Sequence, residues 1–390
     1  MEDVTYQNIG NRNQRTAPGK ARFVGFCLRE RAVQFSSLSR MPESPTAVGA
    51  DFGDGISGDE AHGRARHEHE LGNARAGGDL VLVEACEAFN SFLDLRPLAA
   101  IVTNIEVDHL SFHGTPEHLY ESFRQFLRQV QGFAVLNGDD KLLARMLALP
   151  PHAVTFGTFP QQDYRITGVR LGAESTFVLR HHEEDLGVFT LRVPGLHNIY
   201  NAAAAAALAC ELGAELEAIR RGLAAFPGMH RRFERLGRRG GVEVVDDYAH
   251  HPTEIRATLA AARSAFPGRV VAVFQPHLYS RTRDMLEEFA PALALADYLL
   301  IAPIYAAREE PIDGITHHLI VERLAHAFPR LPVIALSSLA QGVDILTQAT
   351  GGSRAPRQAS ALPTLSAGDV IITIGAGDVD SLAHQLIPKS

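Results

Sequence analysis

The stretch VVDDYAHHPTE, residues 244–254, places two carboxylates, a tyrosine and two adjacent histidines directly after an apolar run. The apolar residues before it predict a buried strand, and Pro252 favours the first turn of a helix after it. In open α/β sheets, ligands bind beyond the carboxyl ends of the strands. The stretch therefore predicts a strand-to-helix connection in such a sheet, with a polar site at the end of the strand.

The sequence on both sides of this stretch alternates short apolar runs with helical patterns, which predicts an α/β fold. After it come RVVAVFQ, DYLLIAP, PVIAL and DVIITIG, the strands of a doubly wound, Rossmann-like domain. Before it, DLVLVEA, LAAIVTNI and GFAVLNGDD predict a mostly parallel sheet. Alternation at period two over 163–193 predicts an antiparallel patch, and FPGMHRR at 226–232 is typical of a linker.

Residues 1–70 differ in composition from the rest of the chain. They are rich in Arg, Gly, Ser and Glu, and RFVGFCL is the one strand candidate among them. We expect this segment to be atypical and largely disordered. The tract HEHE at 67–70 has two interpretations, a metal site or a solvated loop, and the loop is favoured because no ligands at finger spacing accompany it.

The composition of the 390 residues is that of a soluble globular protein. A net charge of −8 argues against a general surface for nucleic acid or anionic membranes. Three separated cysteines are typical of a reducing compartment, and no apolar run is long enough for membrane insertion. We expect a cytoplasmic location.

Polar clusters follow five of the predicted strands. Paired carboxylates with a histidine suit Mg²⁺ held with phosphate oxygens, and paired arginines suit carboxylate or phosphate anions. Each cluster also has a plainer interpretation: Asp246 or Asp247 caps the next helix, the histidines are loop residues, Glu84 is solvated, and GAGDVD is a tight turn. The clusters are EACE at 84–87, TNIEVDH at 103–109, DDYAHH at 246–251, PHLYSRTR at 276–283 and GAGD at 375–378.

Six ordered motifs resemble those of the Mur ligases, over about residues 71–390. The resemblance implies a partial central ATPase domain at 71–226 and a C-terminal ligase domain at 227–390. The motifs are GNARAGGDLVLVEACEAFNSFLDLRPLAAIVTNIEVDHL, GLHNIYNAAAA, FPGMHRRFERLG, VVDDYAHHPTEIRATL, FQPHLYSRTRDMLEEFA and TIGAGD.

The resemblance is nearest to the branch of the family that joins L-alanine to UDP-N-acetylmuramate in peptidoglycan precursor synthesis. It implies ATP and Mg²⁺ as cofactors, with the sugar carboxylate activated as an acyl phosphate that the amino group attacks. Such chemistry depends mainly on positioning and charge neutralisation. Ligases that recycle murein tripeptide share the HHPT motif and are an alternative.

Matching motifs imply roles for single residues. Glu84 and His109 are implied as metal ligands in the catalytic site, and Asn104 lies on the cofactor side. Asn198 and Asn201 are implied to approach the adenine, and Arg232 and Asp247 the phosphate or ribose. The residues implied to face the amino acid and the carboxylate product, His250 and Arg281 also being catalytic, are Tyr248, His250, Arg281 and Arg283.

Three features depart from the family pattern. The phosphate-binding loop GTHGKTT has no counterpart in this sequence, and TAPGKAR at 16–22 lacks its second glycine and its hydroxyl. Cys86 stands where the family has an acidic residue, and Leu278 stands where it has an arginine. A catalytically inactive truncated ligase, a scaffold protein and a ligase with altered substrates are therefore alternatives.

Overall fold

The computed structural model describes residues 22–27, 70–71, 74–77, 80–85, 87–106, 110–351 and 362–387. The chain forms two compact units, and the last boundary between them lies between Ala224 and Ala225. The domain limits at 226 and 227 stay a prediction. None of the described helices is long and apolar enough to cross a membrane.

The C-terminal unit is built on a six-stranded sheet. Its order is β11-β12-β16-β13-β14-β15; β11 runs antiparallel to β12, and the other neighbours are parallel. The strands are β11 (Glu234–Arg239), β12 (Val242–Asp247), β13 (Val270–Phe274), β14 (Tyr298–Ile301), β15 (Val333–Ala335) and β16 (Val370–Ile374).

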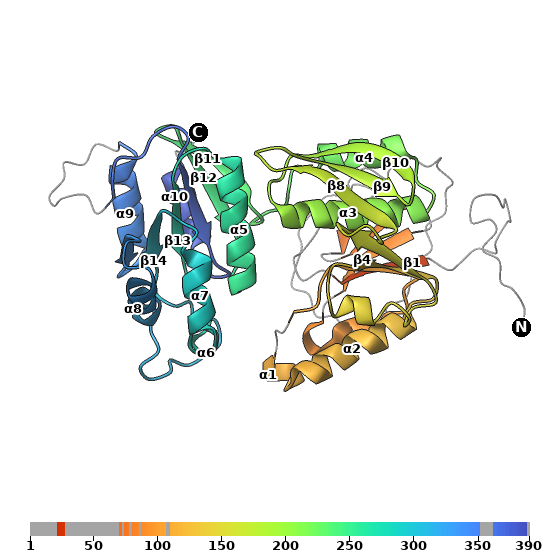
Figure 1. Ribbon diagram of the computed structural model, residues 1–390. Coiled ribbons are helices and arrows are strands. Elements are labelled where there is room, and N and C mark those ends of the chain that lie inside the picture. Colours follow the sequence, from red (N-terminus) through yellow and green to blue (C-terminus); the bar gives the residue numbers. More distant parts are fainter. Residues whose placement is uncertain are drawn as a thin grey trace, which may run out of the picture. The chain divides into compact units, whose positions relative to one another are not determined.

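Helices cover both faces of this sheet (Figure 1). Val270, Ala272 and Phe274 of β13 pack in one core, and Val271 and Val273 pack in the other. This alternation requires a helix layer on each side, because successive strand residues point to opposite faces. One layer holds α5 (Pro252–Ala265), α7 (Leu286–Leu293) and α8 (His318–Ala327), and the other holds α9 (Leu339–Ala349) and α10 (Asp380–Leu386).

The connections on the two sides of β16 diverge. β12 and β13 lead into helices of one layer, whereas β16, which lies between them, leads into α10 of the other layer. A crevice forms at the carboxyl ends of strands whose connections diverge in this way. The residues after β12, β16 and β13 are the polar clusters noted in the sequence.

The preceding part of the chain forms a ten-stranded sheet of order β10-β9-β8-β7-β6-β5-β1-β4-β3-β2. β1 is parallel to β4 and β5, and the loops between β8, β9 and β10 are so short that these strands form antiparallel hairpins. The strands are β1 (Arg22–Cys27), β2 (Glu70–Leu71), β3 (Ala74–Gly77), β4 (Leu80–Ala85), β5 (Ala99–Val102), β6 (Phe133–Asn137), β7 (Ala153–Gly157), β8 (Tyr164–Arg170), β9 (Ser175–His181) and β10 (Glu184–Leu191).

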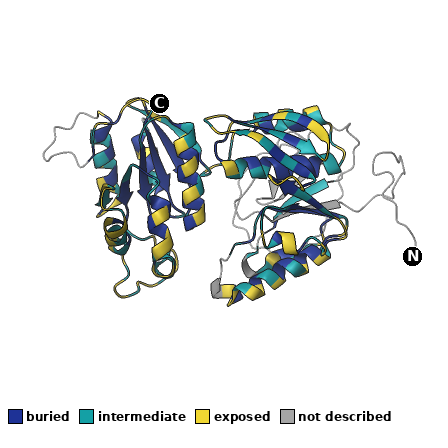
Figure 2. Cartoon of the chain, in the orientation of Figure 1, coloured by how far each residue is buried: buried dark blue, intermediate teal, exposed yellow. Residues whose placement is uncertain are grey.

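Helix α2 (Pro116–Gln129) shows why the helices of this part form where they do. The Thr115 side chain caps its first turn, Pro116 opens it, and Phe123 and Phe126 pack against Phe92. Figure 2 shows its inner face buried and its outer face exposed. The other helices are the 3₁₀ turns η1 (Ala88–Asp94) and η2 (Leu143–Arg145), and α1 (Leu110–His113), α3 (Leu196–Glu211) and α4 (Leu216–Ala225).

Two expectations about the fold are settled. An α/β fold with mostly parallel sheets is confirmed, and RFVGFC is indeed a strand, β1, inserted between β4 and β5. The remainder of 1–70, apart from Glu70, lies outside the described residues, as does the proposed disorder there.

Asp369 joins the amino ends of β13 and β16. Its carboxylate accepts hydrogen bonds from the backbone N–H groups of Arg269 (2.7 Å) and Ser366 (2.8 Å). It also forms an ion pair with the Arg269 guanidinium (2.5 Å). Burial alone would raise the pKa of Asp369, but these hydrogen bonds outweigh it and lower the pKa to about 2.

We therefore expect Asp369→Asn to reduce the free energy of unfolding by about 1–2 kcal/mol at pH 7. A lowered pKa adds stability that is complete above the unfolded value near 4 and is lost as pH falls through about 2. Urea unfolding at pH 7 and pH 3 should show the difference between variant and wild type shrinking at pH 3. A difference independent of pH would contradict this.

Candidate functional site

The end of β12 carries two buried carboxylates. Asp247 accepts hydrogen bonds from the backbone N–H of Phe233 and Ala249 (both 2.8 Å) and from the Thr258 hydroxyl (3.1 Å). Asp246 is 1% exposed and contacts Thr373 and Arg231. Burial raises the pKa of Asp246, and these two partners oppose the shift. Both carboxylates therefore fasten the strand end to its neighbours.

Helix α5 is not capped by either aspartate, which corrects that interpretation of the sequence. The cap is His251, whose Nδ1 accepts the N–H of Thr253, while Glu254 accepts the N–H groups of His250 (2.9 Å) and His251 (3.0 Å). This reciprocal arrangement is a capping box in which a histidine replaces the usual serine or threonine. Asp247 stays a predicted nucleotide contact.

Arg231 is a site residue that the sequence reasoning missed. Its guanidinium donates to the carbonyls of Gly375 (2.7 Å) and Gly377 (3.0 Å) and pairs with Asp246 (3.1 Å). It also lies over the Tyr248 ring, 5.0 Å from the centroid. Arg231 thus joins the ends of β12 and β16, and its backbone is left-handed (φ 57°).

The rings of Tyr248, His250 and His277 form a series of contacts that begins beside Arg231. Arg232 lies 5.4 Å from the centroid of Tyr248, so two guanidinium groups flank that ring. Tyr248 meets His250 edge-on at 5.5 Å, and His250 lies 5.7 Å from His277, centroid to centroid. The structure therefore brings together Arg232, Tyr248 and His250, which the sequence assigned separately to nucleotide and amino acid.

His277 is neutral because of its surroundings. Its Nδ1 lies 3.3 Å from Nη1 of Arg281, and because a guanidinium only donates, this nitrogen accepts. Burial, and then the nearby His250 and Arg281, lower the pKa of His277 to about 4. The Nδ1 of His250 lies 3.0 Å from the Tyr248 carbonyl, which only accepts, so this nitrogen donates. Arg281 is thereby placed beside His277. Its contact with an amino acid stays a prediction.

The short helix α6 (Tyr279–Asp284) carries Arg281. Residues later in the chain, Tyr305 and Glu309, hold its start in place. Glu309 accepts the backbone N–H of Ser280 (3.0 Å) and the Ser280 hydroxyl. Leu278 has φ 71°, a strained value for this residue type, and its N–H bonds to the Tyr305 carbonyl at 2.9 Å. Arg283 is exposed and pairs with Asp284.

The second group of predicted residues lies on the ten-stranded sheet. Glu84 on β4 and Asn104 after β5 are half-buried at the carboxyl ends of parallel strands of one sheet. Asn198 donates to the Pro194 carbonyl (2.7 Å), and Asn201 is half-buried one turn further along α3. His109 and Cys86 lie outside the described residues.

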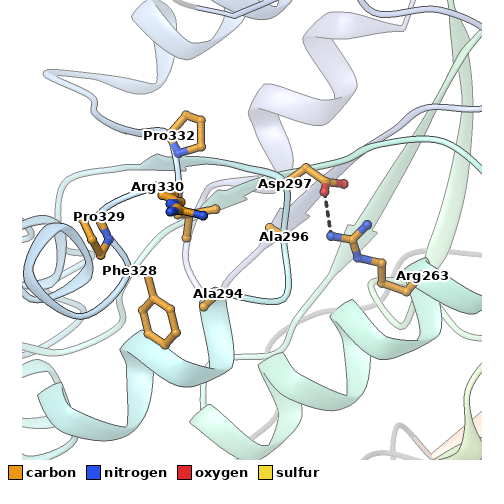
Figure 3. A pocket seen from close by; sticks show the side chains of 9 residues that line it. Arg263, Ala294, Ala296, Asp297, Phe328, Pro329, Arg330 and Pro332 are labelled. Carbon is orange, nitrogen blue, oxygen red and sulfur yellow. Dashed lines mark hydrogen bonds and ion pairs between the residues drawn. The ribbon is translucent and has the colours of Figure 1, made fainter.

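Metal and cavity geometry add two observations. Among the described residues, no group of three or more His, Cys, Asp or Glu side chains is arranged to hold a metal ion. An open depression of about 600 Å³ lies at the amino ends of β14 and β15, lined by the Arg263–Asp297 pair and by Phe328 and Arg330 (Figure 3). It is at the edge opposite the polar crevice, so it does not contain the predicted site.

Comparison with known proteins places this geometry in a family. Residues 69–209 match the Mur ligase middle domain, and residues 231–377 match the Mur ligase glutamate ligase domain. The chain is 40% identical over 329 residues to a UDP-N-acetylmuramate–L-alanine ligase from Desulforamulus reducens, covering 82% of this chain and 67% of the relative. The chain belongs to the Mur ligase family.

Other members of the Mur ligase family give the same picture. A UDP-N-acetylmuramate–L-alanine ligase from Sorangium cellulosum is 42% identical over 80% of this chain and 65% of its own length. The crystal structure of the alanine ligase MurC from Thermotoga maritima matches with a TM-score of 0.63, 26% identity, and coverage of 80% and 64%. The chain thus spans about two thirds of the length of these Mur ligases.

The Arg231–Asp246 pair is open to a direct test. We expect Arg231→Ala to reduce the free energy of unfolding of the C-terminal unit by about 3–5 kcal/mol, because a buried carboxylate would lose its cation. Arg238→Ala is the matched control, since this arginine pairs with Glu243 but is 68% exposed, and we expect a loss of under about 1 kcal/mol. Urea unfolding followed by tyrosine fluorescence measures both, and equal losses would refute the assignment.

The neutrality of His277 predicts its titration. We expect the imidazole C–H resonances of His277 to titrate with a midpoint near pH 4, well below the ordinary value near 6.5. Arg281→Gln should raise the midpoint but leave it below 6.5, because burial is the largest cause of the shift. NMR titration, with His277→Gln to assign the signal, decides this. A wild-type midpoint near 6.5 would be incompatible with the geometry.

Proposed function

We propose that this Mur ligase joins L-alanine to UDP-N-acetylmuramate with ATP, through an acyl phosphate of the sugar carboxylate. The observation that carries the proposal is the assembly of Tyr248, His250 and Arg281 with His277 at the crevice of the C-terminal sheet. The curated relatives at 40–42% identity bear the name of this activity. Cytoplasmic peptidoglycan precursor synthesis is the corresponding cellular role.

The crevice has the chemistry that an amino acid and a carboxylate need. Arg281 offers a planar cation with several N–H donors for a carboxylate. The neutral imidazole of His277 lets an amine approach without a further positive charge at that position. Arg232, 5.4 Å from the centroid of the Tyr248 ring, adds a cation for a phosphate oxygen. We assign the amino acid to the His250–Arg281 end and phosphate to the Arg232 end.

The residues of the ten-stranded sheet fit the proposed cofactors in part. Glu84 supplies the hard carboxylate oxygen that Mg²⁺ prefers, at the carboxyl end of a parallel strand beside β1. Mg²⁺ there would neutralise charge on the transferred phosphoryl group. Asn104, Asn198 and Asn201 supply amide groups suited to the nucleotide. His109 completes the proposed ligand set.

A non-catalytic homologue is a second candidate, favoured by one observation. β1 lies between β4 and β5, and residues 28–79, between β1 and β4, contain no Gly-Lys-Ser or Gly-Lys-Thr sequence. A phosphate loop supplies a lysine for the β- and γ-phosphates and a hydroxyl for Mg²⁺. Single groups that clamp the γ-phosphate can change phosphoryl-transfer rates by roughly three to five orders of magnitude.

Phosphate release and product formation with ATP, MgCl₂, UDP-N-acetylmuramate and L-alanine separate the two candidates. We expect alanine-dependent phosphate release, with the amide product detected by mass spectrometry. Arg281→Lys should lower kcat/KM for alanine by about 10–100-fold, because a lysine cannot reproduce the guanidinium geometry. Arg263→Lys, in the depression at the opposite edge, is the matched control and should leave the rate unchanged.

The outcomes are distinct. A folded protein that binds ADP but forms no amide would support the non-catalytic homologue. Amide formation with an amino acid other than alanine, or with a tripeptide, would support a ligase with altered or recycling substrates. Equal losses in Arg281→Lys and Arg263→Lys would reject the placement of the amino acid beside Arg281.

A further inference from the structure

Asp139, in the turn after β6, is surrounded by hydrogen-bond donors from two other segments. Its carboxylate accepts the backbone N–H (2.6 Å) and hydroxyl (2.7 Å) of Thr158, the hydroxyl of Tyr200 (2.8 Å), the Gln162 amide (3.3 Å) and the N–H of Phe159 (3.4 Å). The Asp139 carboxylate thus accepts five hydrogen bonds, and none of the donors belongs to its own turn. The neighbouring Asp140, by contrast, accepts N–H groups from its own turn.

The glycines at positions 138 and 157, beside Asp139, have no room for a Cβ atom. A Cβ atom added to Gly157 would lie 2.4 Å from an Asp139 oxygen, and one added to Gly138 would lie 2.0 Å from the Gln162 amide oxygen. Burial would raise the pKa of Asp139, but the hydrogen bonds from Thr158 and Tyr200 outweigh it and lower the pKa. Asp139 is therefore a fixed anion at physiological pH.

Tyr200 links the Asp139 carboxylate to helix α3 by a hydrogen bond. It stands between Asn198 and Asn201 in the sequence HNIYN, and its ring meets Phe156 edge-on at 6.3 Å. Burial, and after it the Asp139 carboxylate, help to raise the pKa of Tyr200 to about 12. The phenol consequently stays protonated and donates to Asp139 across the physiological range.

Hydrogen bonds also lead from Asp139 in the other direction, to the end of β5. The side-chain oxygen of Asn137 accepts the N–H of Asp139 (3.0 Å), and its amide nitrogen donates to the Thr103 carbonyl (2.9 Å). The Thr103 hydroxyl then donates to the Asn104 side chain (3.1 Å). A continuous series of hydrogen bonds thus joins Asn104 to Tyr200.

We propose that Asp139 is a positioning residue that fixes α3, from Tyr200 onward, relative to the end of β5. The inference rests on the proposed function, because Asn104, Asn198 and Asn201 are the residues proposed to contact the nucleotide. Asp139 itself has its oxygens turned to Thr158 and Tyr200. It therefore acts on nucleotide binding through the position of Tyr200 and the neighbouring Asn201 in α3.

Two tyrosines allow a matched test. Tyr200→Phe removes one hydroxyl from the series, and Tyr164→Phe removes a hydroxyl that donates to the Glu211 carboxylate (2.9 Å) in the same compact unit. We expect Tyr200→Phe to raise the Kd for ADP by about 10-fold, the effect of one hydrogen bond, and to speed hydrogen exchange at residues 197–203. Tyr164→Phe should change neither quantity. Calorimetry and hydrogen exchange with mass spectrometry measure them in the full chain.

A second pair of variants separates charge from turn geometry. Asp139→Asn should reproduce the effects of Tyr200→Phe, whereas Asp140→Asn should not. If both tyrosine variants weaken ADP binding and loosen 197–203 equally, Asp139 has a general structural role and the proposal is overturned. If the wild-type chain does not bind ADP, the proposed function fails by itself. Hydrogen exchange at 197–203 then still decides the positioning role, and unchanged exchange in Tyr200→Phe overturns it.

Discussion

The buried contact between Arg231 and Asp246 is the constraint on which the C-terminal site depends. Asp246 is 1% exposed, and its burial disfavours the charged form, so a carboxylate there requires a cation. Arg231 meets that need with one part of a planar group whose other N–H donors reach Gly375 and Gly377. One side chain therefore fixes the glycine turn against β12. The residues that follow β12, from Tyr248 onward, take their places from this junction.

The same physical principle occurs in both compact units. In each, a carboxylate at a strand end accepts several donors from its own chain: Asp247 binds Phe233, Ala249 and Thr258, and Asp139 binds Thr158 and Tyr200. Such groups lose their solvation on burial and regain it as fixed N–H and O–H dipoles. They hold rigid the segments from which the site residues project. Their own capacity for a ligand is correspondingly small.

The sequence predicted the features that depend on local pattern. Alternating apolar runs predicted the α/β fold and the helix layers on both faces of the six-stranded sheet. The site expected at the polar strand ends stays a prediction. It did not predict contacts that depend on long-range pairing. Nothing local to Arg231 indicates bonds to residues 144 and 146 positions later, and nothing near Glu309 indicates that it holds Ser280. The cap of α5 was misjudged because histidine is an uncommon capping residue.

At Leu278, the backbone conformation and the chemistry of the side chain have separate determinants. Its left-handed backbone is held by a hydrogen bond to Tyr305, and the turn is held further by Glu309 at Ser280, so the conformation does not depend on the side chain at 278. An arginine could occupy the same backbone with the same strain. Compared with the arginine that the family resemblance implies at this position, the leucine lacks a positive charge, while His277 and Arg281 still contact each other. If a carboxylate binds beside His277, as we propose, Arg281 is the cation that the structure places there.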